Sequence, residues 1–280
     1  GKGGDTPTAD DRGIARHDQG FGRARAERLL LGARADSRTV SFDTSAIDLW
    51  PGRIFSIEHH PHAELSETTR LLVTELSIEG TSVGEWTTSG NAVFADLPYR
   101  PPQRTPKPRV EGVQSATVVG PKGQEIHTDE FGRVRVQFPW DREGKHDEKS
   151  SCWVRAGQGW AGTGYGMIVL PRVGQEVLVG FLEGDPDQPV IVGRVFNALQ
   201  QVPYKLPEHK TRSTWKSNSS PGSGGFNEIM FEDLKGKELV WEQAQKNRRR
   251  LVKHDETITI GHDRQKLVKN DEHEKTLGYL

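Results

Sequence analysis

The chain has 280 residues, of which 33% are hydrophobic and 28% charged, and it contains 31 glycines and 16 prolines. This composition favours short strands joined by turns over a bundle of long helices. The 38 Lys and Arg residues nearly balance 39 Asp and Glu residues, so no net field directs the chain to nucleic acid or an acidic membrane. The single cysteine, Cys152, excludes an internal disulfide framework and fits a reducing cytosol. No segment approaches the roughly 20 apolar residues of a membrane span.

Residues 1–37 are predicted to form a polar start followed by one helix. The segment GRARAERLLLGARADS at 22–37 is rich in Ala, Leu and Arg, which favour a helix, and Asp36 and Ser37 lie near its end. The opening GKGGDTPTADD lacks the apolar core of a signal peptide. We therefore expect no signal peptide, so that any export would need a different route.

Residues 38–100 are predicted to hold short strands, and residues 101–110 a linker. Pro, Gly and Asp separate runs typical of strands, which are RTVSFDTS, GRIFSIEHH, RLLVTELSIEG and NAVFADL. The segment PYRPPQRTPKPRV that follows contains five prolines, which remove backbone donors and hold the chain extended. We expect it to form a stiff connection between two domains.

Residues 111–200 have the pattern of a compact all-β domain. Val134, Val136 and Phe138 alternate with Arg135 and Gln137, as a half-buried strand requires. Further apolar runs are SSCWVRAG, YGMIVLP, QEVLVGFL and QPVIVGRVF, and the turn-forming EGDPDQP lies between the last two. Short strands at this spacing predict a small closed barrel of the oligonucleotide/oligosaccharide-binding (OB) type.

Residues 201–237 are predicted to be a connector and the start of a repeat, which then occupies residues 238–280. The connector contains SNSSPGSGG at 217–225, followed by two strand-like runs around a DLKGK turn. From residue 246 the chain repeats in blocks of eight, which are KNRRRLVK, HDETITIG, HDRQKLVK and NDEHEKTL. The second position of each block is Asn or Asp, and the seventh is a β-branched residue, so the pattern predicts short strands alternating with turns.

These octads cannot be stable in a single chain. Burying one Val or Ile contributes about 1.5–3 kcal/mol, whereas ordering eight residues costs about 12 kcal/mol at roughly 1.5 kcal/mol each. We therefore expect several intertwined copies that pair their strands around a shared axis. Residues on one side of an extended strand share parity, which places four aliphatic side chains at that axis, namely Val252, Ile258, Ile260 and Val268. The alternative is a disordered charged tail, which the regular placement of Val and Ile disfavours.

The sequence resembles the VgrG spike proteins of bacterial type VI secretion. The resemblance rests on FNEIMFEDLKGKE followed by octads of the TITIGHDRQ kind, and on GPKGQEIHTDEFGRVRVQFPWDREGK at 120–145. It also rests on SSCWVRAGQGWAGTGYG at 150–166 and LPRVGQEVLVGFLEGDPDQPVIVGRVFN at 170–197. It covers residues 40–280 and is most specific over 120–235, where long ordered stretches agree.

The resemblance implies a homotrimer similar to the hub and spike of contractile phage tails, with a hub, an OB barrel and a triple-stranded β-helical needle. Residues 38–100 would be the end of the hub, and the octads the start of a truncated needle. The implied function is a mechanical spike that is assembled in the cytoplasm, secreted by injection and driven through a target membrane. The implied partners are the tube protein, a cap protein at the spike tip and effector cargo. A phage-tail spike of the same architecture is the alternative.

Several motifs contain the residue types of a chemical site. The sequence GTSVG at 80–84 fits a serine-hydrolase pattern with Ser82 as nucleophile, but EWTTSGN is a poor start for the helix that must follow. The group His59, His60 and His62 has no cysteine nearby to complete a metal site, and a polar strand end is the simpler interpretation. HEKTL at 273–277 fails the HExxH zinc motif. No catalytic residue, metal site or cofactor is therefore predicted, and the chain is not expected to be an enzyme.

Other single residues have structural interpretations. His254 and His262 recur eight residues apart, either as turn residues or as a stack along the needle. Cys152 is predicted to be a buried thiol in a strand, since a redox role needs an activating cation beside it. Three tryptophans are predicted to lie in the barrel core or an interface, namely Trp140, Trp153 and Trp160.

The barrel could instead be an OB module that binds nucleic acid or a glycan. Within residues 111–200, however, 9 Lys and Arg residues stand against 12 Asp and Glu residues, a net charge of −3. A phosphate backbone requires a basic groove, so we expect no nucleic-acid partner.

Overall fold

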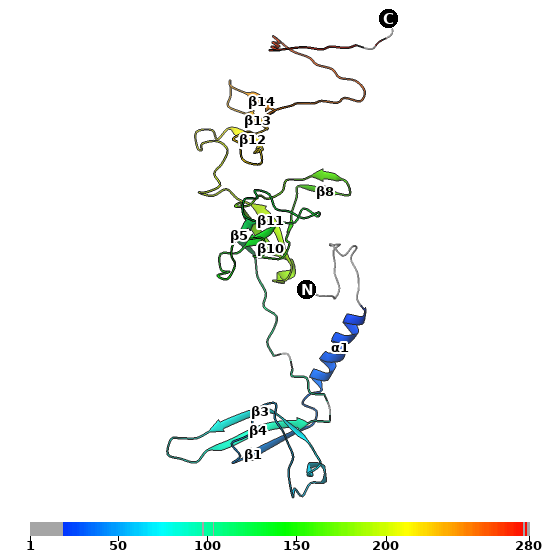
Figure 1. Ribbon diagram of the computed structural model, residues 1–280, viewed down its shortest axis with the longest axis vertical. Coiled ribbons are helices and arrows are strands. Elements are labelled where there is room, and N and C mark those ends of the chain that lie inside the picture. The colour runs from blue at the N-terminus through cyan, green and yellow to red at the C-terminus, as the bar shows by residue number, and fades with distance from the viewer. Residues whose placement is uncertain (1–18, 97, 103, 277, 279–280) are drawn as a thin grey trace. The chain divides into compact units, whose positions relative to one another are not determined.

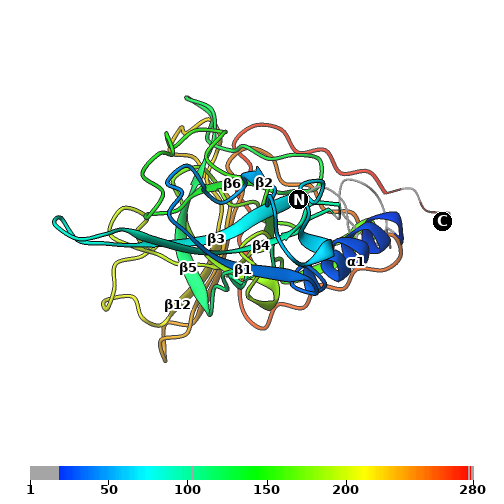
Figure 2. The same ribbon diagram turned by 90° about the horizontal axis from the view of Figure 1, so that it is seen from below.

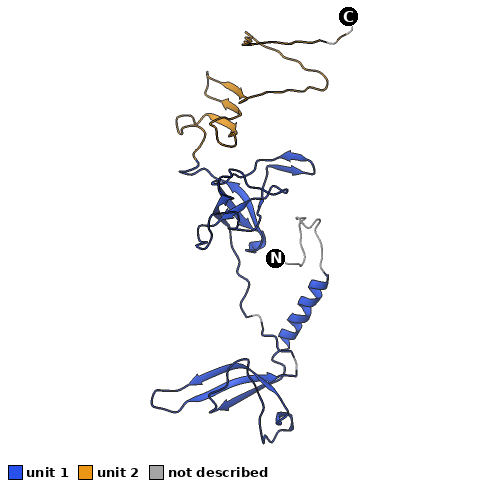
Figure 3. Ribbon diagram, in the orientation of Figure 1, with its two compact units in different colours: residues 1–200 blue, residues 201–280 orange. Residues whose placement is uncertain are grey.

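The computed structural model describes residues 19–96, 98–102, 104–276 and 278. Within these residues lie one α-helix, two short 3₁₀ helices and fourteen strands, so the predicted mainly-β class is confirmed (Figure 1). The chain divides into two compact units, residues 1–200 and residues 201–280 (Figure 3). No helix in the described part of the chain is long and apolar enough to cross a membrane.

Helix α1 spans Gln19–Ala33, three to four residues earlier at each end than predicted. Turns occupy residues 34–36, where the Arg34 N–H still donates to the Leu30 carbonyl at 3.1 Å. An exposed Arg23–Glu27 ion pair at 3.1 Å supports the helix by the favourable i,i+4 spacing. No residue of α1 is buried. The predicted polar start before Gln19 lies outside the described residues.

The first sheet has four antiparallel strands in the order β1-β4-β3-β2. Their bounds are β1 Thr39–Thr44, β2 Ile54–Phe55, β3 Leu71–Glu79 and β4 Thr87–Phe94. A 3₁₀ turn, Ala63–Leu65, lies between β2 and β3. Alternation buries Leu71, Val73 and Ala92 on one face, where Phe42 and Phe55 also meet edge to face at 5.2 Å. These strands agree with those predicted for residues 38–100, and their assignment to the end of a hub domain stays a prediction.

The second sheet is the predicted OB barrel. Its strand order is β6-β5-β10-β11-β7, and a single bridge between Val134 and Val154 joins the two ends. Strands β7 and β11 pair in parallel, whereas the other neighbours are antiparallel. The bounds are β5 Val113–Val119, β6 Arg135–Gln137, β7 Arg155–Ala156, β10 Glu176–Phe181 and β11 Pro189–Arg194. Figure 2 shows the sheets from below.

The barrel core consists almost entirely of β-branched residues, which pack well on a pleated surface. Phe138 and Phe181 stack at 6.2 Å beside it. The fully or nearly buried members are Ala116, Val118, Val134, Val136, Val154, Val177, Val179 and Ile191.

The end of the proline-rich linker is fixed to the turn between β10 and β11. The Lys107 ammonium contacts Asp185 at 2.5 Å and Asp187 at 2.9 Å, and the Val110 N–H donates to the Gly184 carbonyl at 2.9 Å. The hydrogen bond from Lys107, aided by the Asp187 N–H, lowers the pKa of Asp185 to about 2. The 3₁₀ turn Leu182–Gly184 presents this carbonyl from a left-handed Gly184, with φ +75°.

One prediction about the barrel is wrong. Cys152 is exposed and not in a strand, because the strand is confined to Arg155–Ala156 and the bridge at Val154. Trp140 and Trp160 are outside the core, with 64% and 65% of their surface exposed, so for these two only the predicted interface position remains. Trp153 is half-buried between His127, at 5.0 Å, and the Arg135 guanidinium, at 4.4 Å.

The remaining strands form two small sheets. Strands β8 (Trp160–Gly162) and β9 (Tyr165–Met167) make a separate hairpin. In the second unit, β12 (Arg212–Lys216), β13 (Glu228–Glu232) and β14 (Leu239–Gln243) form an antiparallel meander. Residues 244–276 contain no strand in this single chain.

We expect Ile191→Ala to destabilise the barrel by about 2–5 kcal/mol, because it leaves a cavity in a closed core. Urea unfolding followed by far-UV circular dichroism would measure the change. The neighbouring Val192 points outward with 59% of its surface exposed. Val192→Ala is therefore the control, expected to change stability by no more than about 0.5 kcal/mol. Equal losses in both variants would contradict the barrel core described above.

Candidate assembly surface

The β12–β14 sheet has two faces of different character, which its register defines. Residues directly opposite one another share a face. Trp215, Ile229 and Glu242 align on one face together with Phe231 and Val240. The opposite face aligns Thr214, Met230 and Trp241, flanked by rows that contain Glu228 and Glu232.

On the face with Met230 and Glu228, the buried polar side chains find their hydrogen-bond partners within the chain. Both residues are buried. The Tyr204 hydroxyl and the Thr214 hydroxyl donate to the same Glu228 oxygen, at 2.6 and 2.7 Å. Glu232 accepts from the Arg212 guanidinium at 2.9 Å. The segment before β12 thus contributes Tyr204 to this face.

These hydrogen bonds keep Glu228 ionised. Burial opposes ionisation, but the bonds from Tyr204 and Thr214 outweigh burial, so the pKa of Glu228 lies below its ordinary value. Burial first, and then the hydrogen bond to Glu228, raise the pKa of Tyr204. The pair therefore has one fixed arrangement at neutral pH, with the tyrosine as donor.

The opposite face of the sheet is apolar and uncovered. Trp215, Phe231 and Val240 expose 61%, 45% and 62% of their surface. Ile229, between them in the register, is also exposed. A single soluble chain rarely presents contiguous aromatic and aliphatic side chains of this kind except at a binding surface. We call this surface the apolar sheet face.

The octads that follow show a regular pattern of exposure. The seventh-position residues Val252, Ile260 and Val268 are 40%, 49% and 42% exposed, whereas the sixth-position Leu251 and Leu267 are 83% and 84% exposed. The seventh position is therefore less exposed than the sixth, although both are exposed in a single chain. Ile258, the other predicted axis residue, is 56% exposed. None of the four belongs to a core formed by one chain, and their role at an axis stays a prediction.

Ion pairs recur between octads with the same spacing. Arg250 contacts Glu256 at 2.6 Å, and sixteen residues later Lys266 contacts Glu272. Each pair joins the fifth position of one octad to the third position of the next, across the intervening turn. The same contact therefore recurs at two of the three junctions between octads.

The other candidate sites do not assemble. Ser82 lies in the turn between β3 and β4, and a strand follows it where a nucleophile elbow requires a helix. His62 Nδ1 accepts from the Glu64 N–H at 3.3 Å, and so caps a 3₁₀ turn. Within the described residues, no group of three His, Cys, Asp or Glu side chains is placed to bind a metal. His254 and His262 each contact the adjacent aspartate, at 2.8 and 2.9 Å, on exposed turns.

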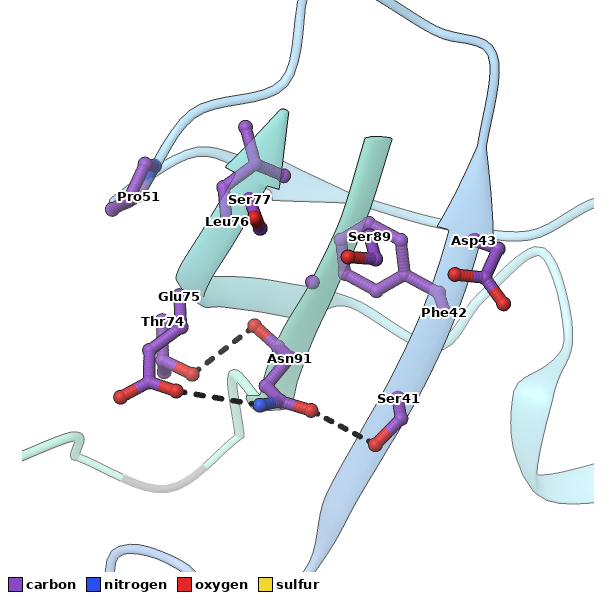
Figure 4. Close-up of a pocket in the computed structure, with 11 residues that line it drawn as sticks. Ser41, Phe42, Asp43, Pro51, Thr74, Glu75, Leu76, Ser77, Ser89 and Asn91 are labelled. Carbon is purple, nitrogen blue, oxygen red and sulfur yellow. Dashed lines mark hydrogen bonds between the residues drawn. The ribbon is translucent and has the colours of Figure 1, made fainter. Parts of the chain in front are cut away.

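A shallow pocket on the first sheet is lined mostly by polar side chains, some of which hydrogen-bond to one another (Figure 4). The Ser41 hydroxyl donates to the Asn91 amide oxygen at 2.8 Å, and the Asn91 amide nitrogen donates to Glu75 at 3.4 Å. Gly90 leaves room for the Phe42 ring, which a Cβ would approach to 2.7 Å. These side chains bond to one another across β1, β4 and β3, and so serve the pairing of the strands.

Comparisons with known proteins match both the barrel and the C-terminal region. Residues 116–196 match the "Type VI secretion system/phage-baseplate injector OB domain" family, and residues 213–278 match the "Bacteriophage T4 gp5 C-terminal trimerisation domain" family. The spike protein VgrG4b of Pseudomonas aeruginosa is 45% identical over 270 residues, covering 90% of this chain and 33% of the relative. VgrG5 of the same organism is 40% identical over 267 residues, covering 89% of this chain and 34% of the relative.

The chain belongs to the VgrG family of type VI secretion spike proteins. It spans about one third of the length of these VgrG relatives. The solved structure of an Escherichia coli type VI secretion component, c3393, covers 65% of this chain and 45% of its own at 21% identity. Its TM-score is 0.43, so we draw nothing from that likeness.

The apolar sheet face was not predicted, although the VgrG-family sequence contains a signal for it. Ile229, Met230 and Phe231 are consecutive apolar residues, as are Leu239, Val240 and Trp241. Strands buried on both faces have such continuous runs, whereas a half-buried strand alternates. One face is covered within the chain at Met230 but not at Trp241 and Leu239, which are 46% and 50% exposed, and the other face is uncovered, so both positions are apolar.

We expect the β12–β14 sheet to lose stability in acid through Glu228. Because the folded-state pKa is lowered, the carboxylate stabilises the fold above the ordinary carboxyl range, and this contribution disappears as the pH falls through the lowered value. Glu228→Gln should reduce protection from hydrogen exchange in residues 212–243 at pH 7 by about 1–3 kcal/mol. It should also flatten the pH dependence between pH 5 and pH 3. Glu208→Gln, at an exposed position, is the control, and an identical pH profile for both variants would disprove the assignment.

Proposed function

We propose that this chain forms part of a homotrimeric spike that is driven mechanically through a target membrane. The proposal rests on the apolar sheet face and on the seventh position of the octads, which is less exposed than the sixth. Both lie within residues 213–278, the segment that matches a trimerisation domain. Three intertwined copies would cover the apolar sheet face and would pair the backbone of the octads, which is unpaired in a single chain.

The proposed axis consists of Val252, Ile258, Ile260 and Val268. The ordering cost of each octad exceeds the contribution of its one to three aliphatic residues, so stability must come from other copies of the chain. In a trimer every octad would pair its backbone with two neighbours and bury its seventh position. The lower exposure of that position supports this arrangement.

The spike role extends to partners and to the route of secretion. We propose that the trimer joins the tube protein of the injection machine, carries a cap protein at its tip, and delivers effector cargo. It would be assembled in the cytoplasm and secreted by the injection machinery itself. The matched relatives are named as secretion spike proteins, which favours this role over that of a phage-tail spike.

We propose a structural role without catalysis for the described part of the chain. The function of this segment would then be stiffness, supplied by a closed barrel and a narrow fibre of paired strands. Binding of nucleic acid by the barrel is disfavoured by its net charge of −3 over residues 111–200.

We expect the chain to have a solution mass near three times 31.2 kDa, about 94 kDa, by light scattering after size exclusion. Ile260→Asp should abolish the trimer, because three carboxylates would meet at a desolvated axis. Leu251→Asp is the matched control, since Leu251 points outward and its substitution should leave the mass unchanged. A monomeric unmodified chain, or equal effects of the two substitutions, would refute the proposed axis.

A further inference from the structure

The β8–β9 hairpin lies outside the five-stranded sheet of the barrel. It begins and ends within residues 156–170, a run of fifteen residues with no charged side chain in a protein that is 28% charged. The hairpin pairs with no other strand in the described sheets (Figure 1). An isolated two-stranded hairpin is marginally stable in water. Burial of this hairpin against another surface would explain why it has no charged side chain.

One face of this hairpin is a continuous apolar surface. The cross-strand pairs Trp160–Met167 and Gly162–Tyr165 lie two residues apart along each strand and so share that face. The Trp160 and Tyr165 rings meet edge to face at 5.7 Å. In a single chain both rings are more than 60% exposed, and Met167 is 41% exposed.

Glycine makes this face flat. A Cβ at Gly162 would lie 2.3 Å from the Tyr165 ring, so only glycine lets the ring lie against the strand. A Cβ at Gly159 would lie 2.6 Å from the end of the Met167 side chain. The aromatic and thioether side chains are therefore held against the hairpin backbone, where they form a preorganised contact surface.

The hairpin base is fixed to the barrel. The Val169 N–H donates to the Gln158 amide oxygen at 3.0 Å, and the Arg194 guanidinium donates to the Val169 carbonyl. Arg194 ends β11, a core strand of the barrel. The apolar surface is thus held at a defined place on a rigid domain.

We infer that this hairpin face docks onto the barrel of a second copy of the chain. The inference rests on the proposed trimer. Only eighteen residues, 195–212, separate the end of β11 from the segment that matches a trimerisation domain. A chain of that length spans at most about 60 Å, so three joined C-terminal segments hold three barrels at a high effective concentration. A small surface without charge suits such a permanent contact between tethered copies better than the capture of a free partner, since obligate interfaces are the more apolar ones.

A matched pair of tryptophans tests the inference. Trp160 and Trp140 are equally exposed, but Trp140 already has partners in its own chain. It stacks on Phe138 at 5.1 Å and donates to Gln114 at 2.9 Å. Trp160→Ser should weaken the trimer by about tenfold or more in its dissociation constant, as loss of a central aromatic contact does. Trp140→Ser should leave that constant unchanged.

The two methionines provide a second measurement. Met167 lies on the hairpin face, whereas Met230 is buried within its own chain. Brief treatment with hydrogen peroxide, read by mass spectrometry, should oxidise Met167 at least several-fold more slowly in the unmodified trimer than in the Ile260→Asp chain, which keeps Trp160 but is expected to be monomeric. Met230 should stay slow in both and serves as the reference.

The outcomes separate the inference from the proposed function. A stable trimer in which Met167 oxidises as fast as in the Ile260→Asp monomer, and which Trp160→Ser does not weaken, would overturn the hairpin contact and leave the spike intact. An unmodified chain that is monomeric at all concentrations would overturn the proposed trimer and the hairpin contact together.

Discussion

The structure depends on one constraint, which is that a single chain cannot bury all of its own apolar side chains. The uncovered share grows from the barrel toward the C-terminal end. The barrel closes on itself around a buried core of valines, one isoleucine and one alanine. The β12–β14 sheet buries Met230 and Glu228 on one face and leaves the other face open. The octads cover nothing, and no strand pairs with them in a single chain. Dependence on other copies therefore increases from the barrel toward the C-terminal end.

The pairing of charged side chains changes in the same order along the chain, from partly buried partners in the barrel to exposed partners in the octads. In the barrel the half-buried Asp129 accepts a hydrogen bond from Arg133 at 2.6 Å, and in the sheet the buried Glu228 accepts from two hydroxyls. In the octads the charges pair on the surface across turns, as in Arg250–Glu256. Exposed pairs of this kind contribute little to stability. Their recurrence instead indicates a repeated backbone geometry, which backbone pairing between chains would make permanent.

Where local patterns alone determine structure, the sequence was sufficient. The alternation of Val134 and Val136 with charged and amide residues predicted a barrel strand correctly, and the helix was misplaced by only a few residues. Family resemblance predicted the barrel and the trimerisation region before any coordinates. Cys152 was predicted wrongly because its neighbours look like a strand, while tertiary pairing limits the strand to two residues. The open face of β12–β14 was missed because a register between distant strands is needed to see that Trp215, Phe231 and Val240 are neighbours. The axis residues remain a prediction, since one chain has no axis.

The contacts of the proline-rich linker also affect how the chain bends. Arg104 contacts Glu75 of β3 at 3.0 Å, and Lys107 contacts the aspartates of the β10–β11 turn. Between these two contacts only Thr105 and Pro106 are left without an anchor, and Pro106 has a fixed φ. The five prolines of residues 98–110 leave this connection few accessible backbone states. A load on the first sheet would therefore reach the barrel through a stiff segment, with less energy lost to flexing than in a glycine-rich connection.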